Sequence, residues 1–172
     1  MKTTTVLTWS ASGLLLPVLD GQFAGRHRSP YVVPLIDMVR HFGTSYERRQ
    51  ILLGFLQYRS VLHRSGLCEG FQWLSGSFVE HIELMEQRPP QDVDIVTFLH
   101  SPPGFKPAAD DSHVFDHAAA KFRYRVDGYF VDLRTVIHEH LVHEAAYWYS
   151  VFAHRRTLVW KGFLQVELAL AE

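Results

Sequence analysis

Hydrophobic residues recur at helical spacing in several segments of the chain, and local start and stop signals agree with that spacing. Helices are therefore expected over 34–41, 44–65, 78–88, 111–120 and 135–152. Thr44 with Glu47, and Ser77 with Glu80, have the spacing of capping boxes, which open helices. These signals predict several helices that are separated by short apolar segments.

Strand-like segments lie between these helices. They are expected at 71–74, 92–98 and 158–168, with a hairpin of 121–126 and 129–134 around Asp127-Gly128. A two-residue Asp-Gly link between alternating strands favours a tight primed turn. In that register Arg123 faces Asp132, and one face carries Lys121, Arg123, Arg125, Asp132 and Arg134. The interleaved helices and strands predict an α+β fold, with a mixed sheet and flanking helices.

The chain has 172 residues, one cysteine and a net charge of −1. Its length without a repeat or linker predicts a single domain over 1–172, with an irregular segment at 1–30. Cys68 alone excludes an intramolecular disulfide and a cysteine-based zinc finger. The balanced charge argues against an extended basic surface for nucleic acid. No apolar run is long enough to span a bilayer. We therefore expect a cytoplasmic protein without a membrane partner.

Two carboxylates stand close together in the segment 73–98. Asp92 and Asp94 lie two apart on an expected strand, so their side chains leave the same face and repel one another unless a cation bridges them. The alternative is a solvated strand end. Gly76-Ser77, at an expected strand-to-helix junction, would present free N–H groups and a hydroxyl to a phosphate. The simpler interpretation of Ser77 is a helix cap.

These residues, together with Asp132 in the sequence FVDL, resemble the signature of the DNA polymerase beta-like nucleotidyltransferase superfamily. Its pattern is an apolar residue (here Leu74), Gly-Ser, Asp-x-Asp on a strand, and a carboxylate on a later strand. The chain is most similar to short, stand-alone bacterial members, with which it shares Gly13-Leu14-Leu15-Leu16-Pro17, Phe42-Gly43, Arg48-Arg49 and Lys161-Gly162. A departure from most members is the fourteen-residue separation between Ser77 and Asp92.

The resemblance implies a minimal nucleotidyltransferase fold that transfers a nucleoside monophosphate from an NTP to a hydroxyl of protein or RNA. Asp92, Asp94 and Asp132 would be catalytic and would hold two Mg²⁺ ions, with Mn²⁺ as an alternative. Gly76 and Ser77 would contact the phosphates. It also suggests a toxin or phage-defence component with a cognate partner protein. A catalytically silent binding or regulatory module of the same fold is the alternative. From the residues themselves, Lys121, Arg123 and Arg125 are candidates to bind the nucleotide or the acceptor.

Other charged clusters have simpler interpretations. The run His138–Glu144 matches neither order of the zinc-protease motif, so a solvated helix edge is favoured over a metal-dependent hydrolase. The acidic and histidine residues of 110–117 are typical of a helix start. Arg48-Arg49 and Arg155-Arg156 are expected to be solvated charges at helix ends, and Asp132 with Arg123 would otherwise be an ordinary surface ion pair.

Overall fold

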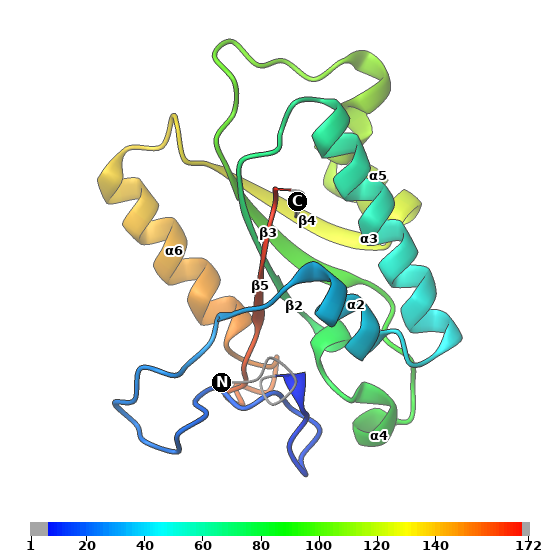
Figure 1. The fold of residues 1–172 in the computed structure, drawn as a ribbon, viewed down its shortest axis with the longest axis vertical. Coiled ribbons are helices and arrows are strands. Elements are labelled where there is room, and N and C mark those ends of the chain that lie inside the picture. Colours follow the sequence, from blue (N-terminus) through cyan, green and yellow to red (C-terminus); the bar gives the residue numbers. More distant parts are fainter. Residues whose placement is uncertain (1–6, 170–172) are drawn as a thin grey trace.

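A computed structural model of the chain describes residues 7–169, which form a five-stranded mixed sheet with helices on both faces (Figure 1). The strands are β1 (Tyr31–Val32), β2 (Gly70–Ser75), β3 (Val93–Leu99), β4 (Val126–Asp132) and β5 (Leu164–Glu167). The helices are α2 (Leu35–Phe42), α3 (Tyr46–Arg64), α4 (Ile82–Glu86), α5 (His117–Tyr124) and α6 (His138–Phe152). Two 3₁₀ turns, η1 (Ser77–Val79) and η2 (Ala109–Val114), complete the set. The predicted α+β class is confirmed.

The strand order is β1-β5-β2-β3-β4. β2 lies antiparallel to both β3 and β5, whereas β4 runs parallel to β3, and β1 runs parallel to β5. The β2–β3 register places Ser75 opposite Asp94, and the β3–β4 register places Asp94 opposite Asp127. The end of β2 and the starts of β3 and β4 therefore meet at one edge of the sheet.

Side-chain alternation divides the core between the two faces of the sheet. Figure 1 shows α3 and α5 on one side and α6 on the other. Leu74 and Ile95 belong to the cluster that packs under α3. Trp73 and Val96 belong to the cluster that packs under α6 with Trp148. Because both faces are covered, burial runs along β2 and β3 without alternation and includes the polar residues Gln72, Ser75 and Thr97.

The hairpin predicted around Asp127-Gly128 is wrong. Its first half is the helix α5, whose N-cap Asp116 accepts a hydrogen bond from the Ala119 N–H at 2.7 Å. Arg125 ends the helix in the left-handed region at φ 55°, and the chain then enters β4. Gly128 lies within that strand because α3 packs close to it: a Cβ there would lie 2.9 Å from Oη of Tyr58. The glycine at position 128 thus accommodates the close approach of Tyr58 to the strand and does not mark a turn.

Other predicted boundaries change more modestly. The helix expected over 78–88 is replaced by η1 and the short α4, and that expected over 111–120 by η2 and α5. The N-cap of α3 is Ser45, which accepts from the Arg48 N–H, and not Thr44. Of the irregular segment expected at 1–30, residues 1–6 lie outside the described part; residues 8–30 form loops with an isolated bridge between Val18 and Arg28.

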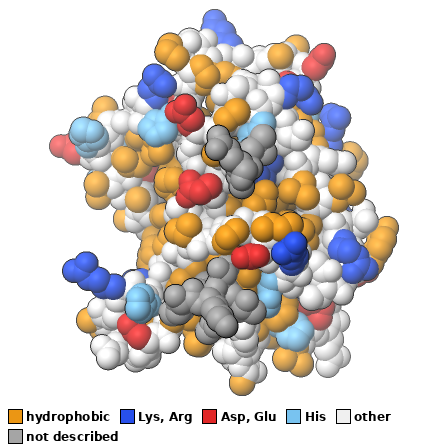
Figure 2. All heavy atoms as spheres, viewed as in Figure 1, with side chains coloured by type: hydrophobic (Ala, Val, Ile, Leu, Met, Phe, Trp, Pro, Cys, Tyr) orange, Lys and Arg blue, Asp and Glu red, His pale blue; other side chains and the backbone are white. Residues whose placement is uncertain are grey.

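On the face shown in Figure 2, acidic and basic side chains are dispersed among apolar ones. No helix within residues 7–169 is long and apolar enough to cross a membrane.

The guanidinium of Arg48 is fully buried, which corrects the expectation that it is a solvated charge. It donates to both carboxylate oxygens of Glu83, at 2.6 and 2.8 Å, and to the carbonyls of Phe78 and Glu80. The group also lies over the ring of Trp9. Four hydrogen bonds and two ring contacts, with Trp9 and Phe78, would be lost together if this side chain were removed. Arg48 therefore fastens the η1–α4 segment to α3.

We predict that Arg48→Met lowers the free energy of unfolding by about 3 kcal/mol, because it leaves Glu83 and two carbonyls without their buried donor. Urea denaturation measures the loss. The matched control is Arg49→Met, since Arg49 is the exposed neighbour. Equal stability of the two variants would contradict the anchoring role of Arg48.

Candidate active site

Three carboxylates, Asp92, Asp94 and Asp127, gather at one end of the β3–β4 pair. Asp94 and Asp127 are direct partners in the parallel register. Asp92 comes immediately before β3 and two residues before Asp94, so it shares the face of Asp94. This is the face that packs against α6 further along the strands. One edge of the sheet thus carries a concentrated negative charge.

Asp94 is the carboxylate whose surroundings change its pKa most clearly. Burial and the charges of Asp127 and Asp92 raise the pKa of its carboxyl from 3.8 to about 6. Gly76 lies directly against it: a Cβ on Gly76 would be 2.7 Å from Oδ2 of Asp94, and its φ of 76° also favours glycine. The Gly76-Ser77 turn and the Asp94 carboxylate are therefore in contact, as the motif spacing suggested.

Lys121 stands between two of the carboxylates. Its Nζ lies 2.9 Å from Oδ2 of Asp92 and 2.9 Å from Oδ2 of Asp127. Hydrogen bonds to Asp92 and Asp127 raise the pKa of Lys121 above its usual value. The last turn of α5 thus provides the cation that offsets the repulsion between these strand ends.

The second oxygen of Asp127 is differently placed. Its Oδ1 is buried and makes no hydrogen bond among the described residues, although Nδ1 of His117 lies 3.1 Å away. Burial and the charge of Asp127 raise the pKa of Tyr129, whose ring contacts His117 and Trp148. An aromatic cluster from α5, β4 and α6 therefore borders the carboxylates.

Buried charged side chains fix the backbone of the Gly76-Ser77 turn. Nζ of Lys161 donates to the Gly76 carbonyl at 3.0 Å and to Oε1 of Glu80 at 2.7 Å. Nε of Arg155 lies 3.0 Å from Oε2 of Glu80. Burial lowers the pKa of Lys161, while Glu80 opposes that change. Glu80 is thus an ion-pair partner, and the capping box predicted for Ser77 and Glu80 is wrong, because Gly76 is the N-cap of η1 and no side chain caps it. Arg155 is not a solvated charge.

Asp132 does not join the other carboxylates. It lies five residues beyond Asp127, about 16 Å along the strand and on the opposite face. The predicted placement beside Asp92 and Asp94 is wrong, because β4 pairs with β3 in parallel and its first residues, rather than its last, meet the Asp-x-Asp segment.

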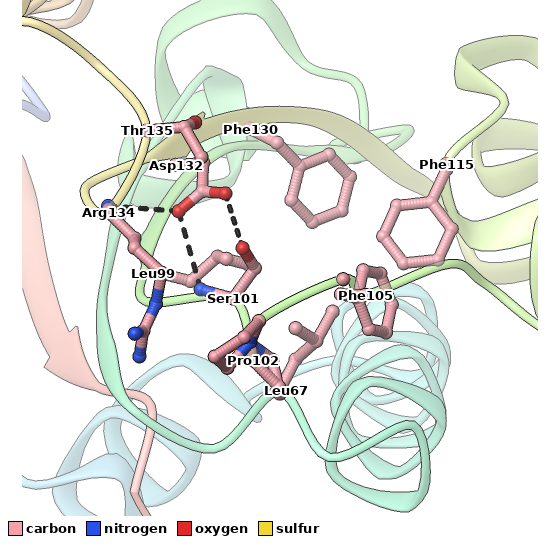
Figure 3. Close-up of a pocket in the computed structure, with 12 residues that line it drawn as sticks. Leu67, Leu99, Ser101, Pro102, Phe105, Phe115, Phe130, Asp132, Arg134 and Thr135 are labelled. Atoms are coloured by element: carbon pink, nitrogen blue, oxygen red, sulfur yellow. Dashed lines mark hydrogen bonds between the residues drawn. The ribbon is translucent and has the colours of Figure 1, made fainter.

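The carboxylate of Asp132 borders a separate apolar pocket of about 550 Å³ (Figure 3). It accepts hydrogen bonds from the N–H and hydroxyl of Ser101 and from the Arg134 N–H. Burial raises the pKa of Asp132, but these hydrogen bonds outweigh it and hold the pKa below its usual value. Figure 3 shows this bonded carboxylate on one side of the pocket and the aromatic rings on the other. Asp132 thus holds the loop after β3 to the end of β4.

Of the three predicted cationic residues, Lys121 is the one whose side chain contacts the carboxylates. The Arg123 guanidinium instead lies 5.5 Å from the ring centroid of Tyr124, and Arg125 is exposed at the end of α5. The expected cationic strand face is therefore absent, because these residues lie on a helix and its C-cap.

The histidine-rich run on α6 contains a contact between His140 and Glu144, and Glu144 also accepts from Trp148. Asp111, in the other predicted cluster, pairs with Arg64 on α3. Among residues 7–169, no group of three or more His, Cys, Asp or Glu side chains is arranged to hold a metal ion. The surface interpretation of these histidines is consistent with their exposure.

The carboxylate cluster nevertheless has the donor chemistry of a hard divalent cation. Carboxylate oxygens are the ligands that Mg²⁺ and Mn²⁺ prefer. Asp92, Asp94 and Asp127 supply them from one sheet edge, and the gap between Asp92 and Asp127 already receives the positive charge of Lys121. The ligand type therefore suits such an ion, but the three side chains are not gathered around one point while the ammonium group of Lys121 lies between two of them.

The fold and site describe an α+β protein with an acidic centre at the edge of a mixed sheet. The chain belongs to DUF6932, a family of unknown function, whose model matches residues 7–167. No curated protein and no solved structure matches it significantly.

Asp127 is the site residue that the sequence analysis missed, because it was assigned to a turn. Two signals point to it in retrospect. Asp116 followed by Ala118-Ala119-Ala120 is a helix start, and Val126 with the apolar run after Gly128 is a strand. A helix that connects two strands favours a parallel pair, which brings the first residues of the second strand beside Asp94.

We predict that Asp94→Asn stabilises the protein at pH 8 in EDTA by up to about 3 kcal/mol, because folding raises the pKa of Asp94 from 3.8 to about 6. The wild-type carboxyl opposes folding when ionised, so its penalty diminishes as the pH falls through 6 and is absent below about 4. Urea denaturation at pH 8 and pH 4 measures this difference. The exposed Asp110→Asn is the control, and a pH-independent effect of Asp94→Asn would contradict the buried charge.

Proposed function

We propose that this protein is a metal-dependent nucleotidyltransferase that transfers a nucleoside monophosphate from an NTP to a hydroxyl group of protein or RNA. The observation that carries the proposal is the convergence of Asp92, Asp94 and Asp127 on one sheet edge, in contact with the Gly76-Ser77 turn. The motif resemblance, with Asp127 in place of Asp132, supports the same assignment.

In this proposal Asp92, Asp94 and Asp127 hold the divalent ions. Bound Mg²⁺ would neutralise the triphosphate and align it for in-line displacement. Gly76 and Ser77 contact the phosphates, because their turn lies against Asp94. The buried Lys161 fixes that turn through the Gly76 carbonyl, so the phosphate contacts are positioned before the nucleotide arrives.

The acceptor and the cellular role are also part of the proposal. NTP and Mg²⁺ are intracellular reagents, which favours a cytoplasmic location. Modification of RNA or protein by such an enzyme would suit a toxin or a phage-defence component, restrained by a cognate partner protein.

A catalytically silent binding module is the second candidate. Lys121 favours it, because its ammonium occupies the gap between Asp92 and Asp127. Such a module would bind nucleotide or RNA without divalent metal, and replacement of Asp94 would leave that binding unchanged. Metal-dependent and metal-independent binding therefore separate the two candidates.

We predict that the purified full chain incorporates label from one or more α-labelled NTPs into RNA or protein of a cell extract, in Mg²⁺ or Mn²⁺. Asp94→Asn and Asp127→Asn each reduce this incorporation by about 100-fold or more, because they remove charge from the proposed metal site. Asp132→Asn, the same substitution on the same strand, leaves it within about threefold, since Asp132 lies on the opposite face.

Calorimetric titration with each NTP in Mg²⁺ provides the independent readout. Absence of nucleotide binding by the folded wild-type protein, or equal loss of incorporation in Asp132→Asn and Asp127→Asn, would contradict the proposal.

A further inference from the structure

Lys121 has a position that the proposed transfer reaction does not explain. The ammonium group lies 2.9 Å from one oxygen of Asp92 and 2.9 Å from one oxygen of Asp127. These carboxylates come from two neighbouring strand ends, and the charge between them comes from a third element, α5. The ammonium thus takes the bridging place that a divalent ion would take between the same oxygens.

The two cations cannot share that place. Mg²⁺ bonds to carboxylate oxygens at about 2.0–2.1 Å and requires a nearly octahedral shell, which an ammonium hydrogen-bonded to the same oxygens obstructs. The charges would also repel at contact distance in a partly buried setting. Binding of a divalent ion therefore requires the side chain of Lys121 to move.

The surroundings of Lys121 permit that movement. Its side chain is 45% exposed, whereas those of Asp92 and Asp127 are 21% and 15% exposed. It projects from the last turn of α5, and a flexible four-carbon stem carries its charge. The carboxylates are held by the strands, so the lysine is the component that can leave without unfolding the sheet edge.

Without a cation in the gap, the sheet edge would carry three neighbouring carboxylates. Asp94 lies opposite Asp127 in the strand register and two residues after Asp92 on the same face, so the three negative charges lie close together. A second positive charge near Asp94 is that of Lys161, which is itself buried and paired with Glu80. Lys121 is therefore the exposed counter-charge of the cluster, and Lys161 the buried one.

We propose that Lys121 is a built-in counter-ion that occupies the site between Asp92 and Asp127 in the metal-free protein and is displaced when a divalent cation binds. This inference rests on the proposed metal-dependent function and adds an internal competitor to the same site. Lys121 then has two effects: it stabilises the metal-free fold and weakens metal binding.

The test is a titration of the full chain with Mn²⁺, followed by electron paramagnetic resonance of the free ion. Lys121→Met is expected to bind Mn²⁺ about tenfold more tightly than the wild type, which corresponds to the removal of a modest competing interaction. Lys106→Met, which removes the same charge from an exposed loop, is expected to leave the affinity unchanged. Asp94→Asn is expected to abolish binding at this site.

Thermal unfolding gives a second readout. In EDTA, Lys121→Met is expected to melt below the wild type, and saturating Mn²⁺ is expected to raise its melting temperature by more than it raises that of the wild type. If Lys121→Met does not fold, Lys121→Gln provides the neutral variant with a hydrogen-bonding group.

The outcomes separate the two proposals. Tighter Mn²⁺ binding by the neutral variant, lost with Asp94→Asn, supports the counter-ion. Equal or weaker binding by the neutral variant, with wild-type binding still dependent on Asp94, overturns the counter-ion and leaves the proposed function intact. Absence of Mn²⁺ binding in both the wild type and the neutral variant overturns both.

Discussion

The parallel pairing of β4 with β3 is the constraint on which the site depends. In its register Asp94 lies opposite Asp127, and the residue before β3 adds Asp92 to the same face. Burial beside two other carboxylates is costly for Asp94, as its raised pKa shows. The sheet core, packed on both faces, stabilises this arrangement, and Lys121 reduces the repulsion that remains.

Buried charged side chains position η1, α4 and the adjoining Gly76-Ser77 turn beside the carboxylates. η1 and α4 are too short to hold themselves in place, and their fixed geometry comes from long side chains on other elements. Arg48 reaches this segment from α3, and Lys161 reaches it from the connection between α6 and β5. The same segment includes the turn that touches Asp94. A loop that would otherwise be mobile is therefore set rigidly beside the carboxylates.

Local signals predicted the α+β class and the positions of α3, β2 and β3, because helix length, capping residues and continuous apolar runs are properties of a few neighbouring residues. They also predicted that Asp92 and Asp94 lie near the Gly76-Ser77 turn, and Gly76 does lie against the Asp94 carboxylate. The assignment of Asp132 failed for a non-local reason: Asp127-Gly128 has the composition of a turn, and only its pairing with β3 and packing under Tyr58 make it a strand. Burial of Arg48 and Lys161 could not be predicted either, since arginine and lysine are usually exposed and their hydrogen-bond partners lie 30 or more residues away.

The central claim is that Asp92, Asp94 and Asp127 form a divalent-cation and nucleotide site. Crystals grown with Mn²⁺ and a non-hydrolysable NTP analogue test it most directly through the anomalous scattering of manganese. We expect an anomalous peak bonded to these carboxylates, with the triphosphate against Gly76-Ser77 and the side chain of Lys121 displaced from the gap between Asp92 and Asp127. A fully occupied nucleotide elsewhere on the protein, with no manganese at the carboxylates and Lys121 still between Asp92 and Asp127, would contradict it.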